Sequence, residues 1–287
     1  MYYGAIEAGG TKMNCAICNE KGEILQTVRI PTENPKETME KIVGFYEDYS
    51  LAALGVGSFG PINLQRGTPD YGRILHTPKV KWEGFSIYEY LVEHLGCRVV
   101  VDTDVNAAAL AEYLYGALQG VDNCMYVTVG TGIGAGIILN GQLHHGMLHP
   151  EAGHILIGKN PKDLVKCFCP FHESCLEGLA AGPAIEARAG RPGSELSQED
   201  PIWDLESDYL AQALVNYTLI LGVERIVLGG GVMEQKHLFP KIRAAYRKRM
   251  GGYMDTSQLR NLDTYIVPPA LGGMQGIKGA LALVLPK

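Results

Sequence analysis

The chain contains one local pattern twice: an apolar strand, a turn of glycine and threonine, and a second apolar strand. The first copy reads YGAIEAGGTKMNCAI from residue 3, and the second reads MYVTVGTGIGAGIIL from residue 125. Two copies so far apart do not make a solenoid, whose many repeats follow one another every ~20–50 residues. We therefore expect two lobes built on one plan, which suits 287 residues at about 150 residues per domain.

Segments at helical spacing alternate with the strands. Residues 97–118, CRVVVDTDVNAAALAEYLYGAL, read as a buried strand, a short loop and an alanine-rich helix. Such alternation predicts an α/β protein with two lobes around a cleft in which a small ligand binds. We place the N-terminal lobe at 1–118, completed by a C-terminal helix at 275–287, and the C-terminal lobe at 119–274.

The composition argues against several classes of function. The net charge is −6, whereas a protein that binds a nucleic-acid backbone usually presents a basic surface. No apolar run reaches the ~18 residues of a membrane span, and the first residues lack the regions of a secretion signal. Without export, the seven cysteines are not expected to form a disulfide framework. We expect a cytoplasmic protein with no nucleic-acid or membrane partner.

Glycine-rich turns can wrap phosphate oxygens with backbone N–H groups. Gly9-Gly10-Thr11-Lys12 and Gly130-Thr131-Gly132 occupy corresponding places in the two copies, and Gly229-Gly230-Gly231 is expected to open a helix. A plain hairpin would explain either turn alone, but the recurrence favours phosphate loops. Residues 153–160 have Walker A spacing but end in Asn and run into proline, so we reject a P-loop there.

Polar side chains follow the expected strand that contains the run VVV at 99–101. Asp102, Asp104 and Asn106 stand between this strand and the alanine-rich helix, where side chains can meet a ligand. Aspartate is also a good helix N-cap, but a single cap needs only one of the two carboxylates. We expect at least one of them to be functional.

The segment 151–178 combines carboxylates with soft metal ligands. Cys169, His172 and Cys175 follow one another at three-residue intervals, with Cys167 close by and His154 upstream. Zinc in structural sites takes four Cys or His ligands, which this segment can supply. Redox chemistry would not explain the histidines, and unrelated buried cysteines are the remaining alternative.

Together these stretches resemble the ROK family (repressors, open reading frames and kinases) of sugar kinases, most closely its bacterial fructokinases. The matching stretches are EAGGTK at 7–12, GVGSFGPI at 55–62, DTDVNAAALAE at 102–112, TVGTGIGAG at 128–136, HPEAGH at 149–154, CPFHESCLEGLAAGPAI at 169–185 and LGGGV at 228–232. The resemblance implies an actin-like ATPase (ribonuclease H-like) fold and ATP-dependent phosphorylation of a hexose. It also implies Mg2+, a structural Zn2+ and a homodimer.

The resemblance assigns roles to matching residues. Asp104 would be the general base that takes the proton of the sugar hydroxyl as its oxygen attacks the γ-phosphate of ATP. The implied substrate-binding residues are Gly60, Pro61, Thr103, Asn106, Glu151, His154 and Glu177. The implied nucleotide and magnesium residues are Glu7, Gly9, Gly10, Thr11, Lys12, Thr131, Gly132, Gly230 and Gly231. The implied zinc ligands are His154, Cys169, His172 and Cys175.

The chain departs from the family pattern at three positions. Many members have Asp where Glu7 stands, and many have a sugar-binding amide where Thr103 stands. Many also bind zinc through three cysteines spaced C-x-C-x4-C. Here we favour His172 over Cys167 as the third ligand of the cluster, because equal three-residue spacing closes a compact knuckle.

We therefore expect an ATP:hexose phosphotransferase, with fructose as substrate and fructose 6-phosphate as product. A mannokinase or glucokinase of the same family is the alternative, because these sugars differ in the placement of one or two oxygens. A sugar-responsive repressor would need a helix-turn-helix before the first phosphate loop, and six residues precede Glu7. A zinc hydrolase with Glu151 as base would need an open zinc position, which four protein ligands close.

Overall fold

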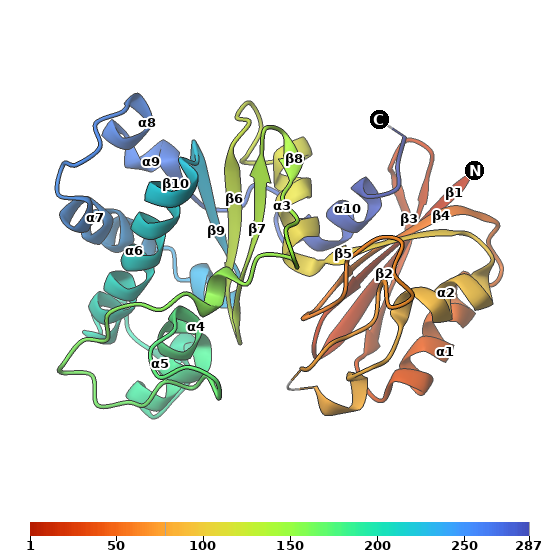
Figure 1. Ribbon diagram of the computed structural model, residues 1–287, viewed down its shortest axis with the longest axis horizontal. Coiled ribbons are helices and arrows are strands. Elements are labelled where there is room, and N and C mark those ends of the chain that lie inside the picture. Colours follow the sequence, from red (N-terminus) through yellow and green to blue (C-terminus); the bar gives the residue numbers. More distant parts are fainter. Residues whose placement is uncertain (78, 287) are drawn as a thin grey trace. The chain divides into compact units, whose positions relative to one another are not determined.

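The computed structural model describes residues 1–77 and 79–286, which form two compact α/β units. Unit 1 comprises Met1–Tyr115, Leu143–His149 and the chain from Leu271 onward; unit 2 comprises Gly116–Gln142 and Pro150–Ala270. Each unit is built on a five-stranded sheet (Figure 1). Within the described ranges, no helix has the length and apolar character needed to cross a bilayer.

The sheet of unit 1 combines antiparallel and parallel strands. Its order is β3 (Ile24–Pro31), β2 (Lys12–Asn19), β1 (Tyr2–Ala8), β4 (Leu51–Ser58) and β5 (Arg98–Thr103). β1 is antiparallel to β2 and parallel to β4, which is also parallel to β5. The strands β1, β4 and β5 therefore end at one edge of the sheet, where ligand-binding residues of parallel sheets gather.

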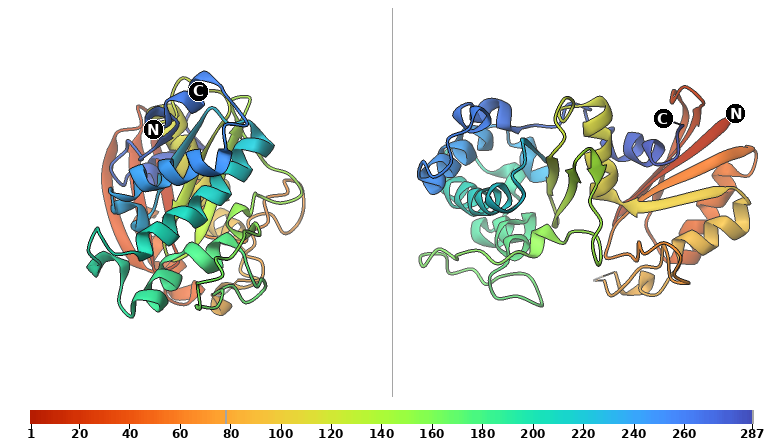
Figure 2. Two further views of the ribbon diagram at one scale, coloured as in Figure 1. Left: turned by 90° about the vertical axis from the view of Figure 1, so that its left-hand side faces the viewer. Right: turned by 45° about the horizontal axis from the view of Figure 1, so that its top comes forward.

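Helices cover both faces of this sheet (Figure 1 and Figure 2). α1 (Pro35–Tyr46) and α2 (Ile87–Leu95) share one apolar core with the sheet. α10 (Gln275–Ala282) packs on the opposite face, together with α3 (Asp104–Tyr115). A short 3-10 turn, η1 (Val80–Trp82), precedes α2 and buries its tryptophan in the first core.

Glycine allows α10 to pack closely on both of its neighbours. A Cβ on Gly55 of β4 would collide with the carbonyl oxygen of Ala280, and a Cβ on Gly279 would collide with that of Ala107 in α3. Backbone therefore meets backbone with no side chain between, a contact that glycine alone permits. This contact fixes α3, and with it Asp104 at its first turn, against the end of the sheet.

The sheet of unit 2 repeats the strand–turn–strand plan. Its order is β10 (Ile266–Val267), β9 (Arg225–Gly229), β6 (Cys124–Val129), β7 (Ile133–Leu139) and β8 (Gln142–Leu143). The helices are α4 (Leu176–Ala180), α5 (Gly182–Ala189), α6 (Ile202–Leu221), α7 (Leu238–Met250), α8 (Ser257–Arg260) and α9 (Leu262–Tyr265). The 3-10 turns are η2 (Ala152–His154), η3 (Gly193–Glu195) and η4 (Gly231–Glu234).

Both predicted strand–turn–strand repeats are antiparallel hairpins, formed by β1 with β2 and by β6 with β7. The third glycine stretch differs from the prediction, because it opens the short turn η4 and the next α-helix begins only at Leu238. Gly230, which directly precedes η4, has a φ of 89°, in the left-handed region that an α-helix cannot use, so the helical turn begins only after it.

Candidate active site and metal centre

The turn between β5 and α3 presents the candidate base. Thr103 caps the helix, because its Oγ1 accepts the N–H of Asn106 at 3.1 Å. The Oδ1 atom of Asp104 accepts the N–H of Val105 at 2.8 Å. Thr103 therefore caps α3, and the carboxylate of Asp104 is available to a ligand.

The surroundings of Asp104 suit a general base. Burial is the main reason that the pKa of Asp104 is raised to about 7. The hydrogen bond from the Val105 N–H lowers this pKa, and the negative charge of Glu7 raises it further. A base whose pKa lies near the working pH is deprotonated in a large fraction of molecules and still binds a proton well. Thr103, by contrast, is buried with its hydroxyl engaged in the cap.

Glu7 lies close to the base at the end of β1. Its Oε2 accepts a hydrogen bond from Nδ2 of Asn14 at 2.7 Å. Gly276 of α10 leaves space for this carboxylate, since a Cβ there would collide with it. Carboxylate oxygens of this kind are the ligands that Mg2+ prefers.

The glycine turn after β1 is held at both sides. The N–H of Gly9 donates to the carbonyl of Lys12 at 3.0 Å, and the hydroxyl of Thr32 donates to the carbonyl of Gly9 at 2.8 Å. Lys79 fills the space beside Gly10, so that a Cβ on this glycine would lie 2.8 Å from the lysine Nζ. The sequence alone did not identify Lys79 as a candidate, although its positive charge suits a phosphate loop.

The loop after β4 rests on a histidine of the same unit. The N–H of Ile62 donates to Nε2 of His149 at 3.2 Å. Gly60 lies against this ring, because a Cβ on it would be 3.3 Å from Cε1 of His149. The expected sugar loop, Gly60 and Pro61, is thus supported from the segment Leu143–His149.

The buried carboxylate of Asp102 makes two side-chain contacts beside the base. Its Oδ1 accepts from Nδ2 of Asn106 at 2.6 Å, and its Oδ2 lies 2.9 Å from Nε2 of His145. The hydrogen bond with Asp102 raises the pKa of His145, and burial opposes this rise. Asn106 is fully buried, and among the described residues its Oδ1 has no hydrogen-bond partner. Contact of Asn106 with a sugar stays a prediction.

The glycine turns of unit 2 lie next to each other. The N–H of Gly130 donates to the carbonyl of Gly132 at 2.9 Å, and the carbonyl of Gly130 accepts from Gly182 at the start of α5. A Cβ on Gly130 would lie 3.8 Å from the backbone nitrogen of Gly231. The second phosphate loop, whose Thr131 is exposed, and the expected adenosine position at 230–231 are therefore adjacent.

Glu177 joins the candidate metal-binding segment, residues 151–178, to the candidate phosphate loop at Gly130–Gly132. Its Oε2 accepts the N–H of Ile133 at 2.8 Å, and its Oε1 lies 3.8 Å from Nε2 of His154. Glu151 directly precedes η2 and is exposed. The structure thus brings Glu177 and His154 together beside Gly132, whereas the other expected sugar ligands belong to unit 1.

Four candidate zinc ligands converge in unit 2. The ligand atoms of His154, Cys169, His172 and Cys175 all lie within 4.8 Å of one another. The Sγ atom of Cys169 lies 3.2 Å from Nδ1 of His172 and 3.7 Å from Nδ1 of His154, which suits ligands at ~2.0–2.3 Å from one tetrahedral zinc. Cys167 lies outside this set and packs against Gly178.

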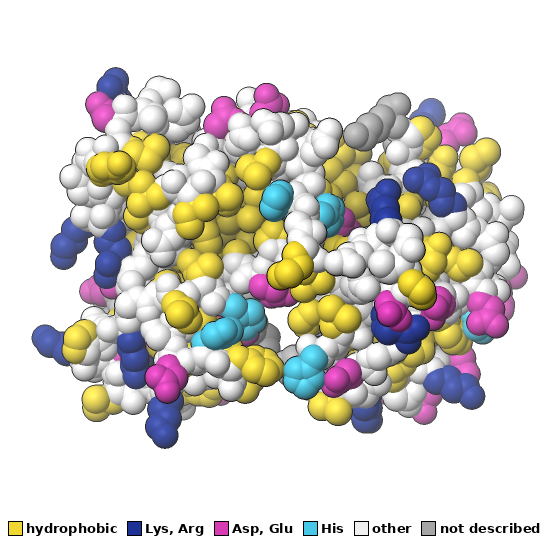
Figure 3. All heavy atoms as spheres, viewed as in Figure 1, with side chains coloured by type: hydrophobic (Ala, Val, Ile, Leu, Met, Phe, Trp, Pro, Cys, Tyr) yellow, Lys and Arg dark blue, Asp and Glu magenta, His cyan; other side chains and the backbone are white. Residues whose placement is uncertain are grey.

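Histidine side chains (cyan in Figure 3) gather on the surface of unit 2 over the chain between β8 and α4. The rings of His154 and His172 are 5.4 Å apart between their centroids. Two thiols and two imidazoles form a donor set typical of a closed structural zinc site.

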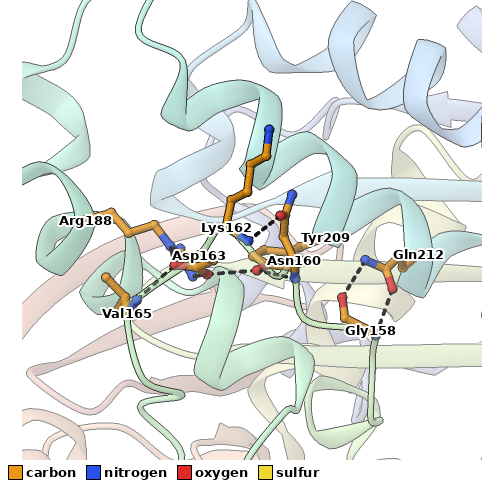
Figure 4. Close-up of polar contacts among 8 residues, drawn as sticks. All are labelled: Gly158, Asn160, Lys162, Asp163, Val165, Arg188, Tyr209 and Gln212. Carbon is orange, nitrogen blue, oxygen red and sulfur yellow. Dashed lines mark hydrogen bonds and ion pairs between the residues drawn. The ribbon is translucent and has the colours of Figure 1, made fainter.

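A network of polar contacts fastens the loop before the cysteines to α5 and α6 (Figure 4). Oδ2 of Asp163 accepts from Nη2 of Arg188 and from the hydroxyl of Tyr209, both at 2.8 Å. Burial would raise the pKa of Asp163, but the bonds from Arg188 and Tyr209 outweigh it and lower the pKa. Gln212 of α6 exchanges two hydrogen bonds with the backbone of Gly158. These contacts hold the candidate metal-binding segment to α5 and α6 without a metal ion.

Comparison with known proteins places this geometry in a family. The chain is 47% identical over 281 residues to a protein of Bacillus subtilis, a match that covers 98% of this chain and 94% of the relative. It is 42% identical over 283 residues to the fructokinase of Pediococcus pentosaceus, covering 99% of this chain and 97% of that protein.

Solved structures share the fold over the whole chain. The ROK hexokinase of Thermus thermophilus superposes with a TM-score of 0.77 at 28% identity, covering 99% of this chain and 97% of that one. The ROK family glucokinase of Streptomyces griseus, solved with glucose and AMPPNP, gives 0.77 at 26% identity and 99% coverage of both chains. The expected actin-like ATPase fold is thereby confirmed. The ROK family model matches residues 3–287, and the chain belongs to the ROK family.

Proposed function

We propose that the chain is an ATP-dependent fructokinase that converts D-fructose to fructose 6-phosphate. The observation that carries the chemistry is Asp104, a half-buried carboxyl group at the start of α3 whose pKa is raised to about 7. Fructose is favoured because four fructokinases are 38% to 43% identical over 89% to 99% of the chain. Three glucokinases are 30% to 32% identical over 63% to 80% of it.

In this reaction Asp104 accepts the proton of the attacking sugar hydroxyl. The hydroxyl oxygen forms a bond to the terminal phosphorus of ATP, and the bond from that phosphorus to the bridging oxygen breaks. The electron pair of the broken bond leaves with ADP. Because the pKa of Asp104 is about 7, the carboxylate form is available at neutral to mildly alkaline pH and can later release the proton to water.

The glycine turns hold the phosphates of ATP with their backbone N–H groups. In unit 1 this turn is Gly9–Lys12, and in unit 2 it is Gly130–Gly132, with Gly230 and Gly231 beside it on the adenosine side. Magnesium supplies positive charge that offsets the phosphate charge during transfer. Glu7 is the residue that would hold this ion, directly or through water.

Each unit contains polar groups that we assign to the sugar hydroxyls. In unit 2 these are His154, Glu177 and Glu151, of which the first two are already positioned against each other. In unit 1 they are the Gly60–Pro61 loop and the β5–α3 turn with Thr103 and Asn106. A site that hydrogen-bonds several hydroxyls discriminates strongly against sugars that leave one of its groups unpaired.

Zinc has a structural role in this proposal. His154, Cys169, His172 and Cys175 would complete a four-ligand shell with no position left for a reacting water. A zinc ion held by these residues would cross-link η2 to the start of α4 and so help to position His154 and Glu177. The hydrolase alternative has no support in this closed donor set.

The active protein is a cytoplasmic homodimer in this proposal. The metal-binding segment exposes large apolar side chains, which commonly mark a protein interface. They are Leu156, Leu164, Phe168 and Phe171. Light scattering coupled to size-exclusion chromatography would give twice the chain mass of 31.2 kDa, and a single chain mass at micromolar concentration would contradict the dimer.

A hexose panel tests the activity. Purified protein, ATP and Mg2+ are mixed with fructose, mannose or glucose, and ADP release is followed. We expect the highest kcat/KM with fructose. ADP release with none of these sugars would refute the kinase, and a higher kcat/KM with glucose or mannose would refute the choice of substrate.

A further inference from the structure

Lys79 lies over the first phosphate loop of unit 1. A Cβ on Gly10 would collide with Cε of Lys79 and would lie 2.8 Å from its Nζ. The lysine therefore occupies the space that a side chain at position 10 would take, with its ammonium group directly beside the loop backbone. The two residues are distant in the sequence, and the fold alone brings them together.

The backbone of Lys79 is held in place by its neighbours. Its carbonyl accepts the N–H of Trp82 at 2.7 Å, and its N–H donates to Oγ1 of the buried Thr77 at 3.3 Å. Trp82 is itself buried, and its indole N–H donates to the carbonyl of Glu33 at 2.9 Å. Its ring packs edge-to-face on Phe59 at 5.7 Å. An anchored turn thus presents the lysine to the loop.

Among the residues that the structure describes, none provides a counter-ion for the ammonium group of Lys79. Within residues 1–77 and 79–286, no carboxylate lies within the 4.0 Å ion-pair distance of it. Lys41, on α1 of the same unit, shows the usual arrangement, with its Nζ paired to Glu33. Lys79 is also half-buried, and a partly desolvated cation without a partner gains most from an anionic ligand.

We propose that Lys79 is a catalytic residue that binds the phosphoryl group of ATP during its transfer; this rests on the sugar-kinase function proposed above. The loop at Gly10 begins after Glu7, whose charge acts on Asp104, so the phosphate nearest this part of the loop is the one that the sugar attacks. As the oxygen–phosphorus bond forms and the bond to ADP breaks, the ammonium group donates hydrogen bonds to the non-bridging oxygens. The proton of the sugar hydroxyl goes to Asp104.

The test compares Lys79→Met with Lys81→Met. Lys81 stands two residues further along the same turn and is exposed, which makes it a matched control. Removal of one donor to transition-state charge typically costs about 10²–10³-fold in kcat. We expect such a loss in kcat for Lys79→Met with little change in KM for fructose, near-wild-type rates for Lys81→Met, and partial recovery in Lys79→Arg.

A binding measurement without turnover provides a second readout. With fructose present, ADP plus aluminium fluoride imitates the transferring phosphoryl group, whereas ADP alone does not. We expect Lys79→Met to weaken binding of the fluoride complex at least tenfold and to leave ADP binding unchanged. Equal affinity for the fluoride complex in both proteins would contradict the proposal, as would unchanged kcat or an effect confined to KM for fructose.

A second variant and the activity of the wild-type protein serve as controls. Lys79→Gln is measured beside Lys79→Met, so that a folding defect in one variant does not decide the outcome; both must match the wild-type melting temperature. A wild-type protein that phosphorylates no sugar would refute the proposed kinase function. A wild-type protein that phosphorylates fructose, together with fully active Lys79 variants, would refute only the role of Lys79.

Discussion

Nε2 of His145 lies 2.9 Å from Oδ2 of Asp102 and ties the segment Leu143–His149 to the end of β5. The side chain of His145 is 38% exposed and that of Asp102 is 8% exposed, so water screens this pair only in part. Besides Asp102, the groups that act on His145 are the carbonyl of Leu143, which raises its pKa, and Arg66, which lowers it.

This pair predicts a stability that falls with rising pH. The pKa of His145 is raised above its ordinary value of 6.5, first by the hydrogen bond to Asp102. The stabilisation is therefore complete below pH ~6.5 and is lost as the pH rises through the folded-state pKa. Relative to His145→Gln, we expect wild type to gain about 0.5–1 kcal/mol at pH 6 and less at pH 9, from urea unfolding.

The pair of His76 with Glu83 is a matched control. Its atoms are 3.1 Å apart, but the two side chains are 72% and 43% exposed. Exposed pairs contribute little, so His76→Gln should leave the unfolding midpoint nearly unchanged. A difference between wild type and His145→Gln that is the same at pH 6 and pH 9 would argue against the ion pair.

Asp104 predicts a pH profile of activity. Because burial raises its pKa to about 7 and the base acts as the carboxylate, kcat/KM should fall tenfold per pH unit well below pH 7 and level off above it. The measurement is the initial rate at low fructose concentration from pH 5.5 to 9. The residual activity of Asp104→Asn should show no such inflection; a profile with the same inflection in the variant would assign the titration to another group.

Zinc content tests the metal site. Wild type and Cys167→Ser should each hold about one zinc per chain, because Cys167 lies outside the set of converging ligands. Cys169→Ser and His172→Ala each remove one of the four ligands and should lose most of the metal. Chelation should lower the melting temperature of wild type, since bound metal stabilises the folded state. Retention of zinc by Cys169→Ser with loss in Cys167→Ser would reverse the assignment.

Because α10 packs closely on α3, one added methyl group at Gly279 should lower the free energy of unfolding strongly. Gly279→Ala drives a Cβ into the carbonyl oxygen of Ala107, and such overpacking costs about 1–3 kcal/mol or more in unfolding free energy. Gly44 in α1 is the control, because a Cβ there meets no atom within 4 Å. Gly44→Ala should stabilise by ~0.5–1 kcal/mol through helix propensity. Denaturant unfolding measures both, and equal effects would show that α10 can shift.

The sequence predicts the elements whose signals are local. The hairpins around the two glycine turns follow from alternating apolar residues with glycine between them, and α3 follows from its run of alanines. The ligand set His154, Cys169, His172 and Cys175 could be named because three of its members lie within seven residues.

Contacts between distant parts of the chain could not be predicted from the sequence. Lys79 reaches Gly10, and His145 reaches Asp102, only because the sheet of unit 1 gathers separate segments at one edge. Neither residue belongs to a motif with fixed spacing. At Gly231, where a helix was expected, the chain forms only the short 3-10 turn η4, which follows the left-handed backbone of Gly230.

The assignment of Asp104 as the base of a fructokinase can be tested by measuring fructose 6-phosphate formation from fructose and ATP at pH 8. Wild type should form this product, and Asp104→Asn should keep the melting temperature and fructose affinity while kcat falls about 10²–10⁴-fold. A kcat near the wild-type value in Asp104→Asn would show that Asp104 is not the base.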